Sequence, residues 1–306
     1  MITETTLSGA APLIIRLVCA LLQALVLFAL APLFSGLARV IRAKMHSRQG
    51  PGLLQDYRDI IKLLKRQSVA PEHAGGVFRL MPFILIGSML LVAMTLPAVT
   101  LRSPFGAGGD IITLLYLFTL FRFFFSLAGL DSGSPFAGIG ASRELTLGIL
   151  VEPILILSLL VVALIAGSTN IGNISHVLAE GAWLSPTATG LALLACAFAT
   201  FIEMRKMPFD VAEAEQELQE GPLTEYADAG LELVKWGISL KQVVVAVLFL
   251  SIFVPFGKAD SFTLGAMLWG SITLLLKLLV VFIAALAFVF TSPVYRSPSR
   301  LWIRSL

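Results

Sequence analysis

The stretch IITLLYLFTLFRFFFSLAGL, from Ile111 to Leu130, contains twenty residues, of which only Arg122 is charged. A hydrocarbon core about 30 Å thick is crossed by roughly 20 apolar residues in helical conformation. A helix pairs its backbone polar groups within the segment, as lipid surroundings require. The stretch therefore predicts a transmembrane helix, and it places a positive charge inside the membrane.

The rest of the chain repeats this pattern. Of its 306 residues, 57% are hydrophobic and 13% are charged, whereas a typical soluble domain is roughly 25% charged. The first apolar run is too long for a signal peptide and follows no basic segment, so we expect it to be retained. The same length criterion predicts spans near residues 12–37, 81–100, 111–130, 145–166, 187–203, 240–256 and 262–290. The sequence thus predicts an all-α, polytopic membrane protein of about seven transmembrane helices, with residues 1–306 as a single integral domain.

The distribution of Lys and Arg predicts how these spans are oriented. Seventeen of the 22 basic residues fall in the odd-numbered loops and the C-terminal tail, whereas the even-numbered loops hold only Arg102 and Lys258. Positive charge gathers on the cytoplasmic side of membrane proteins. We therefore expect the N-terminus outside, and the loops at about 38–80, 131–144 and 204–239 in the cytoplasm.

The cysteines and histidines do not form the spacing of a redox centre. Cys19 and Cys196 stand alone in apolar runs, and the three histidines are far apart in sequence. Iron–sulfur clusters and haem need grouped cysteines or facing histidines. We therefore expect this chain to bind no metal or cofactor, and any electrons to be carried by another subunit.

The first cytoplasmic loop is predicted to contain an amphipathic helix at the membrane surface. After a Gly50-Pro51-Gly52 turn, Leu53, Tyr57, Ile60 and Leu64 recur at helical spacing, with charged residues on the other faces. An apolar stripe beside basic residues suits a helix that lies on lipid. The same basic face could equally dock a partner protein, and the residues alone leave both interpretations open.

Arg122 needs a partner, because a charge in mid-bilayer costs several kcal/mol, at least about 2.5. Glu152 lies eight residues beyond Glu144, which is expected to open the following span, and Arg122 lies eight residues before the end of its own span. At a rise of 1.5 Å per residue, Arg122 and Glu152 reach the same depth of about 12 Å. The spacing predicts an ion pair between them. Glu203 closes the fifth span on the same side.

The segment MPFDVAEAEQELQEG, residues 207–221, packs five acids without a base. Asp210 and Glu213 have the spacing of a capping box, and Gly221-Pro222 is a helix stop, so the pattern predicts a helix between them. On that helix Glu215 would point away from a shared face formed by Asp210, Glu213, Glu217 and Glu220. Clustered carboxylates raise one another's pKa. The face suits either a basic partner or proton handling.

Three stretches together resemble a known family. They are RQGPGLLQDYRDIIKLLKRQ at 48–67, GLDSGSPFAGIGASRELTLGILVEP at 129–153, and IEMRKMPFDVAEAEQELQEGPLTEY at 202–226. With the intervening spans, residues from about 20 to 280 are similar to the membrane subunit of hydrogenase-4, formate hydrogenlyase and related energy-converting nickel–iron hydrogenases. The likeness to the quinone-cavity membrane subunit of respiratory complex I is more distant. After about Leu286 the chain leaves the family pattern and lacks its eighth helix, so we expect a shortened reading frame.

The resemblance implies a non-catalytic subunit of an oxidoreductase complex in the bacterial inner membrane. Its expected partners are the nickel–iron hydrogenase large and small subunits, iron–sulfur subunits, antiporter-like membrane subunits and lipid, but no nucleic acid. The nickel–iron centre and iron–sulfur clusters are expected in those partner subunits. The residues expected to dock the partners are Arg48, Gly50, Pro51, Gly52, Asp56, Arg58, Asp59, Lys62, Asp131, Arg143 and Arg205. The residues expected to form a proton path are Arg122, Glu144, Glu152, Glu203, Asp210, Glu213, Glu215, Glu217 and Glu220.

Three other functions compete with this one. A quinone-site subunit of a complex I-type NADH dehydrogenase would use the same loops. A secondary transporter would also place charges inside the membrane, although the inverted repeat that many transporters show is not visible in this sequence. A purely structural anchor would use its acids only to dock a basic subunit.

Overall fold

The structure is a computed structural model that describes residues 13–45, 47–67, 71, 74–100, 109–180, 185–206, 208–213, 219–227, 229–259 and 264–291. Within these ranges the fold is all helical, and seven helices are long and apolar enough to cross a membrane. They are α1 (Leu13–Met45), α3 (Gly76–Thr95), α4 (Ile111–Asp131), α5 (Pro135–Ala166), α7 (Pro186–Glu203), α9 (Ala229–Phe253) and α10 (Leu264–Thr291). The predicted fold class and the seven predicted spans are confirmed.

Two helices begin well before their predicted spans. Helix α5 starts at Pro135 instead of residue 145, and α9 starts at Ala229 instead of residue 240. Hydropathy marks only the most apolar part of a helix, whereas Pro at the first turn sets the start of α5. The expectation that Glu144 opens its helix was therefore wrong, and Lys241 lies in the middle of α9 instead of at its start.

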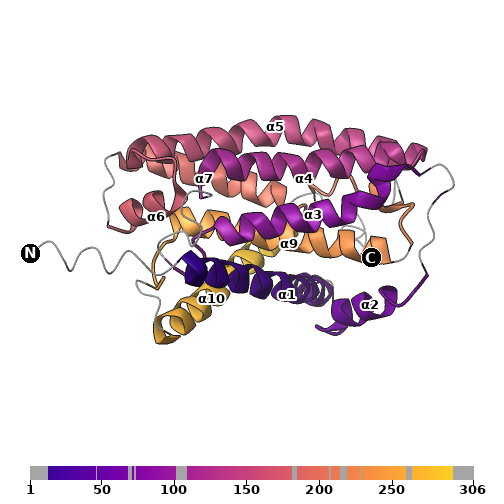
Figure 1. Cartoon of the computed structure of the whole chain (residues 1–306), viewed down its shortest axis with the longest axis horizontal. Helices are drawn as coiled ribbons and strands as arrows, with labels where there is room; N and C mark the ends of the chain where they lie inside the picture. Colours follow the sequence, from indigo (N-terminus) through magenta and orange to yellow (C-terminus); the bar gives the residue numbers. More distant parts are fainter. Residues whose placement is uncertain are drawn as a thin grey trace, which may run out of the picture.

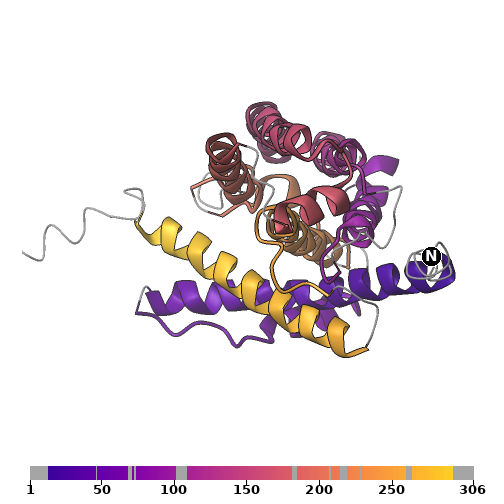
Figure 2. The same ribbon diagram turned by 90° about the vertical axis from the view of Figure 1, so that its left-hand side faces the viewer.

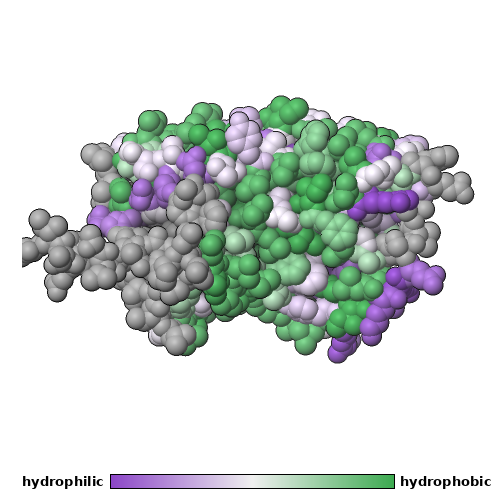
Figure 3. Space-filling model, in the orientation of Figure 1, coloured by the Kyte–Doolittle hydropathy of each residue, from purple (hydrophilic) through white to green (hydrophobic). Residues whose placement is uncertain are grey.

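Helix α9 lies at the centre of the bundle (Figure 1), where it packs against α1, α3, α7 and α10. Of its most apolar stretch 83% is buried, against 28–44% for the other six spans. Helices α4, α5 and α7 form one side of the bundle, and α10 crosses α1 obliquely on the other side (Figure 2). The face of the molecule seen in Figure 3 is mainly apolar between the two ends, where the polar side chains gather. This is the surface expected of a membrane-embedded bundle.

Helix α2 (Gln55–Leu63) is the predicted amphipathic helix, and it packs against α1 and α9. Asp56 forms an ion pair with Arg39 of α1, and the Tyr57 hydroxyl donates to the carbonyl of Ala29. These contacts turn Asp56 and Ile60 inward. The helix is shorter than the predicted stripe, because Leu53 and Leu64 lie beyond its two ends.

The acidic segment does not begin as the predicted helix. The chain from Asp210 to Glu213 is not helical, because it turns back toward the bundle, where Glu213 reaches Arg205. A 3₁₀ turn, η2 (Gly221–Leu223), follows. The bend is tight at Gly221, whose backbone has φ +53°, and a Cβ there would clash with the carbonyl oxygen of Ala212. Only glycine fits so close an approach.

Prolines inside α1 and α3 free one carbonyl each. Each freed carbonyl accepts a hydrogen bond from an aromatic side chain of another segment. Proline removes the N–H that would donate to the carbonyl four residues earlier. Pro82 frees Phe78, whose carbonyl accepts a hydrogen bond from the Tyr226 hydroxyl at 2.6 Å, with the two rings stacked. In α1, Pro32 frees the carbonyl of Phe28 in the same way. There the Trp236 indole of α9 donates at 2.8 Å and stacks on the ring.

The unpredicted helix α6 (Ile171–Ala179) follows α5 and packs against α9. It begins at Asn170, whose side-chain oxygen accepts a hydrogen bond from the backbone N–H of Gly172 at 2.9 Å. This is an ordinary helix cap, and its signal in the sequence is only an Asn before a short apolar run. The helix lies at the end of α9 that is farther from the acidic segment.

Candidate functional site

Arg122 of α4 lies at the centre of a buried group of charges. Its guanidinium donates to three carboxylates, from Nε to Glu144 at 3.3 Å, from Nη1 to Glu152 and from Nη2 to Glu203. The predicted pair of Arg122 with Glu152 is therefore present. Arg122, Glu144 and Glu203 are 6%, 3% and 5% exposed, so these charges are compensated by one another instead of by water.

Gly148 makes room for the guanidinium. Glu144, Gly148 and Glu152 follow one another at intervals of four residues on α5, so they share one face of that helix. A Cβ at Gly148 would lie 2.6–2.8 Å from the Cδ, Nη1 and Nε atoms of Arg122. The sequence analysis missed this residue, although a glycine midway between two acids on one helix face is a signal that could have found it.

Two further cations complete the network. Arg205, just beyond α7, contacts Glu144 from Nη2 at 2.5 Å, and Lys241 of α9 contacts Glu203 from Nζ at 2.7 Å. Both cations are buried. Lys241 was expected at the start of its helix and was missed as a site residue, because that helix begins eleven residues earlier than the hydropathy predicted. Arg205 was expected to dock a partner, but its side chain is part of the interior.

The aromatic run of α4 supports these two cations. The Arg205 guanidinium lies 4.4 Å from the ring centre of Phe125, and the Lys241 ammonium lies 5.1 Å from that of Phe121. A cation over an aromatic face is attracted by the negative face of the ring's quadrupole, by roughly 1–2 kcal/mol when both are desolvated. Phe121 and Phe125 are one turn apart and flank Arg122 in the sequence. The stretch that spans the membrane therefore also forms a wall of the site.

Glu213 joins the acidic segment to this network. Its carboxylate accepts from Arg205 Nη1 at 2.9 Å, and its side chain is 21% exposed. At the other end Glu152 is 25% exposed and accepts from the hydroxyl of Thr119 at 3.4 Å. Five charges of alternating sign thus form one continuous line, in the order Glu213, Arg205, Glu144, Arg122 and Glu152.

The seven members of the network do not balance in charge. Four carboxylates face three cations, so the ionised network carries one excess negative charge and a single proton would neutralise it. Burial raises the pKa of Glu213 from 4.5 to about 7, and Asp210 adds to the rise while Arg205 opposes it. Burial lowers the pKa of the neighbouring Lys206 to about 8. The proton is therefore expected to reside on Glu213 near neutral pH.

The other predicted acids are not part of this line. Glu220 faces Lys235 at 3.6 Å in a partly exposed pair. Asp210 lies beside Lys206 and Glu213, at the edge of the network. Glu215 and Glu217 lie outside the described residues. The shared acidic face that the sequence predicted is replaced, where the structure describes it, by one acid that points inward and one that points to α9.

The predicted docking residues differ in how exposed they are. Six are exposed around α2 and the turn before it, namely Arg48, Gly50, Pro51, Gly52, Arg58 and Lys62. Asp59 and Arg143 are half-buried. Asp56 is buried against Arg39, and the carboxylate of Asp131 accepts from the backbone N–H of Phe78 at the start of α3. Asp56 and Asp131 therefore contact other parts of this chain.

Among the residues that the structure describes, no group of three or more His, Cys, Asp or Glu side chains could hold a metal ion. The site consists instead of ion pairs inside a bundle of membrane-spanning length. Ionisable residues in such a position commonly mark the path of ions or protons. The fold and site together define a polytopic membrane protein with a paired network of charges inside its bundle.

Comparisons with known proteins agree with this class and identify the family. The family model for NADH dehydrogenase matches residues 17–302. The match continues beyond Leu286, after which the sequence was expected to leave the family pattern. The chain therefore belongs to the NADH dehydrogenase family. It is 66% identical over 266 residues to hydrogenase-4 component C of Escherichia coli K12, which covers 87% of this chain and 84% of that protein. It is 58% identical over 260 residues to formate hydrogenlyase subunit 4 of the same organism, covering 85% of each.

More distant relatives extend the likeness. NADH-quinone oxidoreductase subunit 8 of Thermus thermophilus is 33% identical over 214 residues, which cover 65% of this chain and 57% of that protein. A chain in the structure of an archaeal membrane-bound sulfane sulfur reductase superposes with a TM-score of 0.78. The superposition covers 90% of this chain and 89% of that chain, at 24% sequence identity. At that identity the likeness shows the shared fold.

Proposed function

We propose that this chain is the membrane subunit of a hydrogenase-4 or formate hydrogenlyase type of complex. In this role it holds a nickel–iron hydrogenase arm against the membrane and couples the arm's electron transfer to proton movement. The observation that carries the proposal is the line of alternating charges from Glu213 to Glu152. The line runs from Glu213 in the acidic segment, which is expected to meet the arm, to the partly exposed Glu152 of α5.

The line is suited to passing on a change of charge. Arginine does not give up its proton in proteins, so the carboxylates and intervening water must carry any proton that moves. Arg122 is shared by three carboxylates, and protonation of one of them weakens its hold on the guanidinium. The guanidinium then binds the other two more strongly. A proton arriving at Glu144 would in this way shift Arg122 toward Glu152 and Glu203.

Glu213 is the natural point of control. It is a partly exposed member of the acidic segment, and with a pKa of about 7 it gains or loses a proton at little cost near neutral pH. A redox change in an arm docked on this side would alter the local potential and shift that equilibrium. Arg205 would transmit the shift to Glu144, because the two acids compete for one guanidinium.

The test is to substitute the two ends of the line in the complete complex. We expect Glu213→Gln and Glu152→Gln to leave dye-linked hydrogenase activity of the arm within about twofold while proton movement in membrane vesicles falls by roughly tenfold or more. Glu180→Gln, just after α6, is the matched control, because Glu180 is exposed and pairs only with His176 among the described contacts. Unchanged proton movement in both variants would refute the coupling role.

The nickel–iron arm is itself part of the proposal and needs its own test. Purification of the tagged chain from membranes should recover a nickel- and iron-containing hydrogenase that evolves hydrogen. Charge reversal of Glu213 and Glu217 to Lys should weaken recovery of the arm if the acids also dock it. Loss of the arm with normal coupling in the Gln variants would favour the anchor-only role.

A quinone-site subunit is the second candidate, because relatives at 31–33% identity are named NADH-quinone oxidoreductase subunits. A short-chain quinone distinguishes the two functions. If the complex oxidises hydrogen or another donor with stoichiometric formation of quinol, and a quinone-site inhibitor blocks it, the quinone role is favoured. For the hydrogen-evolving complex we expect no quinol formation above that of membranes lacking this chain.

A further inference from the structure

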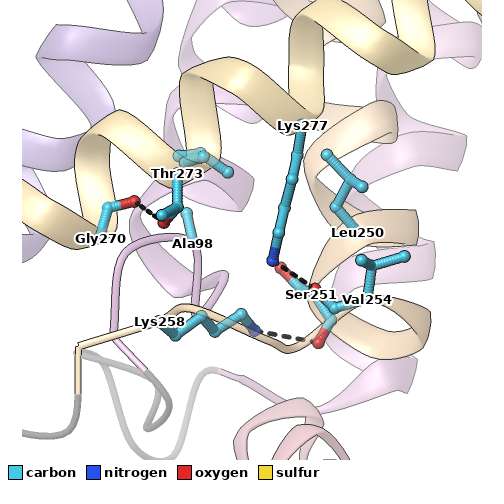
Figure 4. Close-up of a pocket in the computed structure, with 9 residues that line it drawn as sticks. Ala98, Leu250, Ser251, Val254, Lys258, Gly270, Thr273 and Lys277 are labelled. Carbon is cyan, nitrogen blue, oxygen red and sulfur yellow. Dashed lines mark hydrogen bonds between the residues drawn. The ribbon is translucent and has the colours of Figure 1, made fainter.

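A second group of cations lies at the C-terminal end of α9, away from the network. Lys258 follows that helix, and Lys277 comes from the middle of α10 (Figure 4). Both terminal nitrogens point toward the last turn of α9. Lys277 donates to the carbonyls of Val254, at 2.8 Å, and Phe256, while Lys258 donates to the carbonyl of Ser251 at 3.0 Å and to the Ser175 hydroxyl at 2.8 Å.

The two lysines line a small pocket with donors left over. An ammonium group has three N–H donors, and the contacts above use two on each lysine. The pocket is also lined by Thr273 and Gly270 of α10 and by Leu250 and Ala98. Thr273 Oγ1 lies one turn from Lys277 and is hydrogen-bonded to the carbonyls of Gly257 and Gly270.

Both cations are held by neutral oxygen atoms in the described part of the chain, in contrast to Lys241, which has a carboxylate. Two positive charges that share a pocket repel one another and favour an added anion. Burial lowers the pKa of Lys258 to about 7, and Lys277 contributes to the decrease. An anion between them would remove this repulsion and use the remaining N–H donors.

The surroundings of the pocket indicate where such an anion would come from. On α10, Leu268, Ile272 and Leu276 are spaced by one turn and are 52–64% exposed. Phe256 and Trp269, beside the pocket residues in sequence, are 62% and 64% exposed. Exposed Leu and Ile on a membrane helix contact acyl chains, and an exposed Trp is typical of the headgroup level.

We propose that the pocket of Lys258 and Lys277 binds the phosphate of an anionic phospholipid, whose acyl chains lie along the exposed face of α10. Basic pockets between transmembrane helices bind acidic lipid headgroups in this way. The lipid would join α10 to the C-terminal end of α9. The inference is independent of the proposed proton coupling.

The test uses the full chain in mild detergent, after its co-purified lipid has been washed away. Native mass spectrometry then compares binding of dioleoyl-phosphatidylglycerol with that of dioleoyl-phosphatidylcholine, which has the same acyl chains. We expect the wild-type chain to favour phosphatidylglycerol. K258Q/K277Q should bind phosphatidylglycerol more weakly by a factor on the order of ten or greater. The conservative K258R/K277R variant should retain the preference.

Controls separate the pocket from general attraction to positive charge. K44Q/R79Q removes the same charge from two exposed positions on α1 and α3, and it should bind like the wild type. Equal binding of the two lipids by the wild type, or equal loss in K44Q/R79Q, would overturn the proposal. The comparison in the wild type keeps the proposal falsifiable even if K258Q/K277Q does not fold. A third arm titrates sodium phosphate, and displacement of the lipid preference by millimolar phosphate would overturn the lipid in favour of a free anion.

Discussion

Around the middle of α9 a lysine is held by a carboxylate, whereas at the C-terminal end of the same helix two lysines are held by carbonyl groups. Lys241 contacts Glu203, and Lys277 contacts Val254 and Phe256. Carboxylates can gain and lose protons, and backbone carbonyls cannot. The acceptors of the first group can therefore change their charge, whereas those of the second stay neutral and fix the helix end.

The largest difference between the two regions is expected on removing one cation from each. Arg122→Leu leaves two buried carboxylates and the partly exposed Glu152 without their shared partner, which should cost about 3–5 kcal/mol of stability. Lys277→Met leaves two carbonyls without a donor and should cost only about 1–2 kcal/mol. Thermal unfolding of the purified chain measures both. Similar losses for the two variants would contradict the distinction.

Steric access to Arg122 can be blocked without changing any charge. Gly148→Ala places a methyl group 2.6–2.8 Å from Arg122, so the guanidinium must shift away from its carboxylates, at a cost of about 1–3 kcal/mol. Gly190→Ala on α7 is the control, because a Cβ there meets no heavy atom within 4 Å. It should be neutral or stabilise by up to about 1 kcal/mol, because alanine favours helix. Equal melting temperatures of the two variants would refute the close fit.

The proton on Glu213 can be detected through the pH dependence of stability. Its pKa is raised from 4.5 to about 7, so between these values the folded chain holds a proton that the unfolded chain has lost. This contribution is complete below about pH 4.5 and is lost as pH rises through 7. From pH 5 to 8 the wild type should lose about 1–3 kcal/mol more than Glu213→Gln. Parallel pH profiles of melting temperature would show that Glu213 does not titrate there.

Much of this arrangement was predictable from charge spacing and depth. Arg122 and Glu152 could be paired because a charge inside the membrane needs a partner, and the helical rise fixed their relative depth. The alternation of apolar spans and basic loops likewise predicted seven helices. These features depend on local composition and on the thickness of the bilayer.

The remainder depended on contacts between segments far apart in the sequence. Lys241 and Glu144 were placed at helix starts, because hydropathy falls wherever a buried ion pair interrupts an apolar helix. The acidic segment was predicted as a helix from its spacing, but Arg205 offers Glu213 a buried partner that a regular helix starting at Asp210 would not reach. Such partners become visible only once the helices are packed.

The smallest effect is expected for another hydrogen bond to a backbone carbonyl, which the Tyr226 hydroxyl donates to Phe78. Tyr226→Phe keeps the ring stack but removes the hydroxyl, so it should cost about 1 kcal/mol in the wild type. In a Pro82→Ala background the backbone N–H gained at position 82 can donate to the freed carbonyl, and the same substitution should then cost much less. The difference between the two costs is the coupling energy of the double-mutant cycle. If Tyr226→Phe costs the same in both backgrounds, the hydroxyl does not compensate for the proline, and the carbonyl at Phe78 must be satisfied in another way.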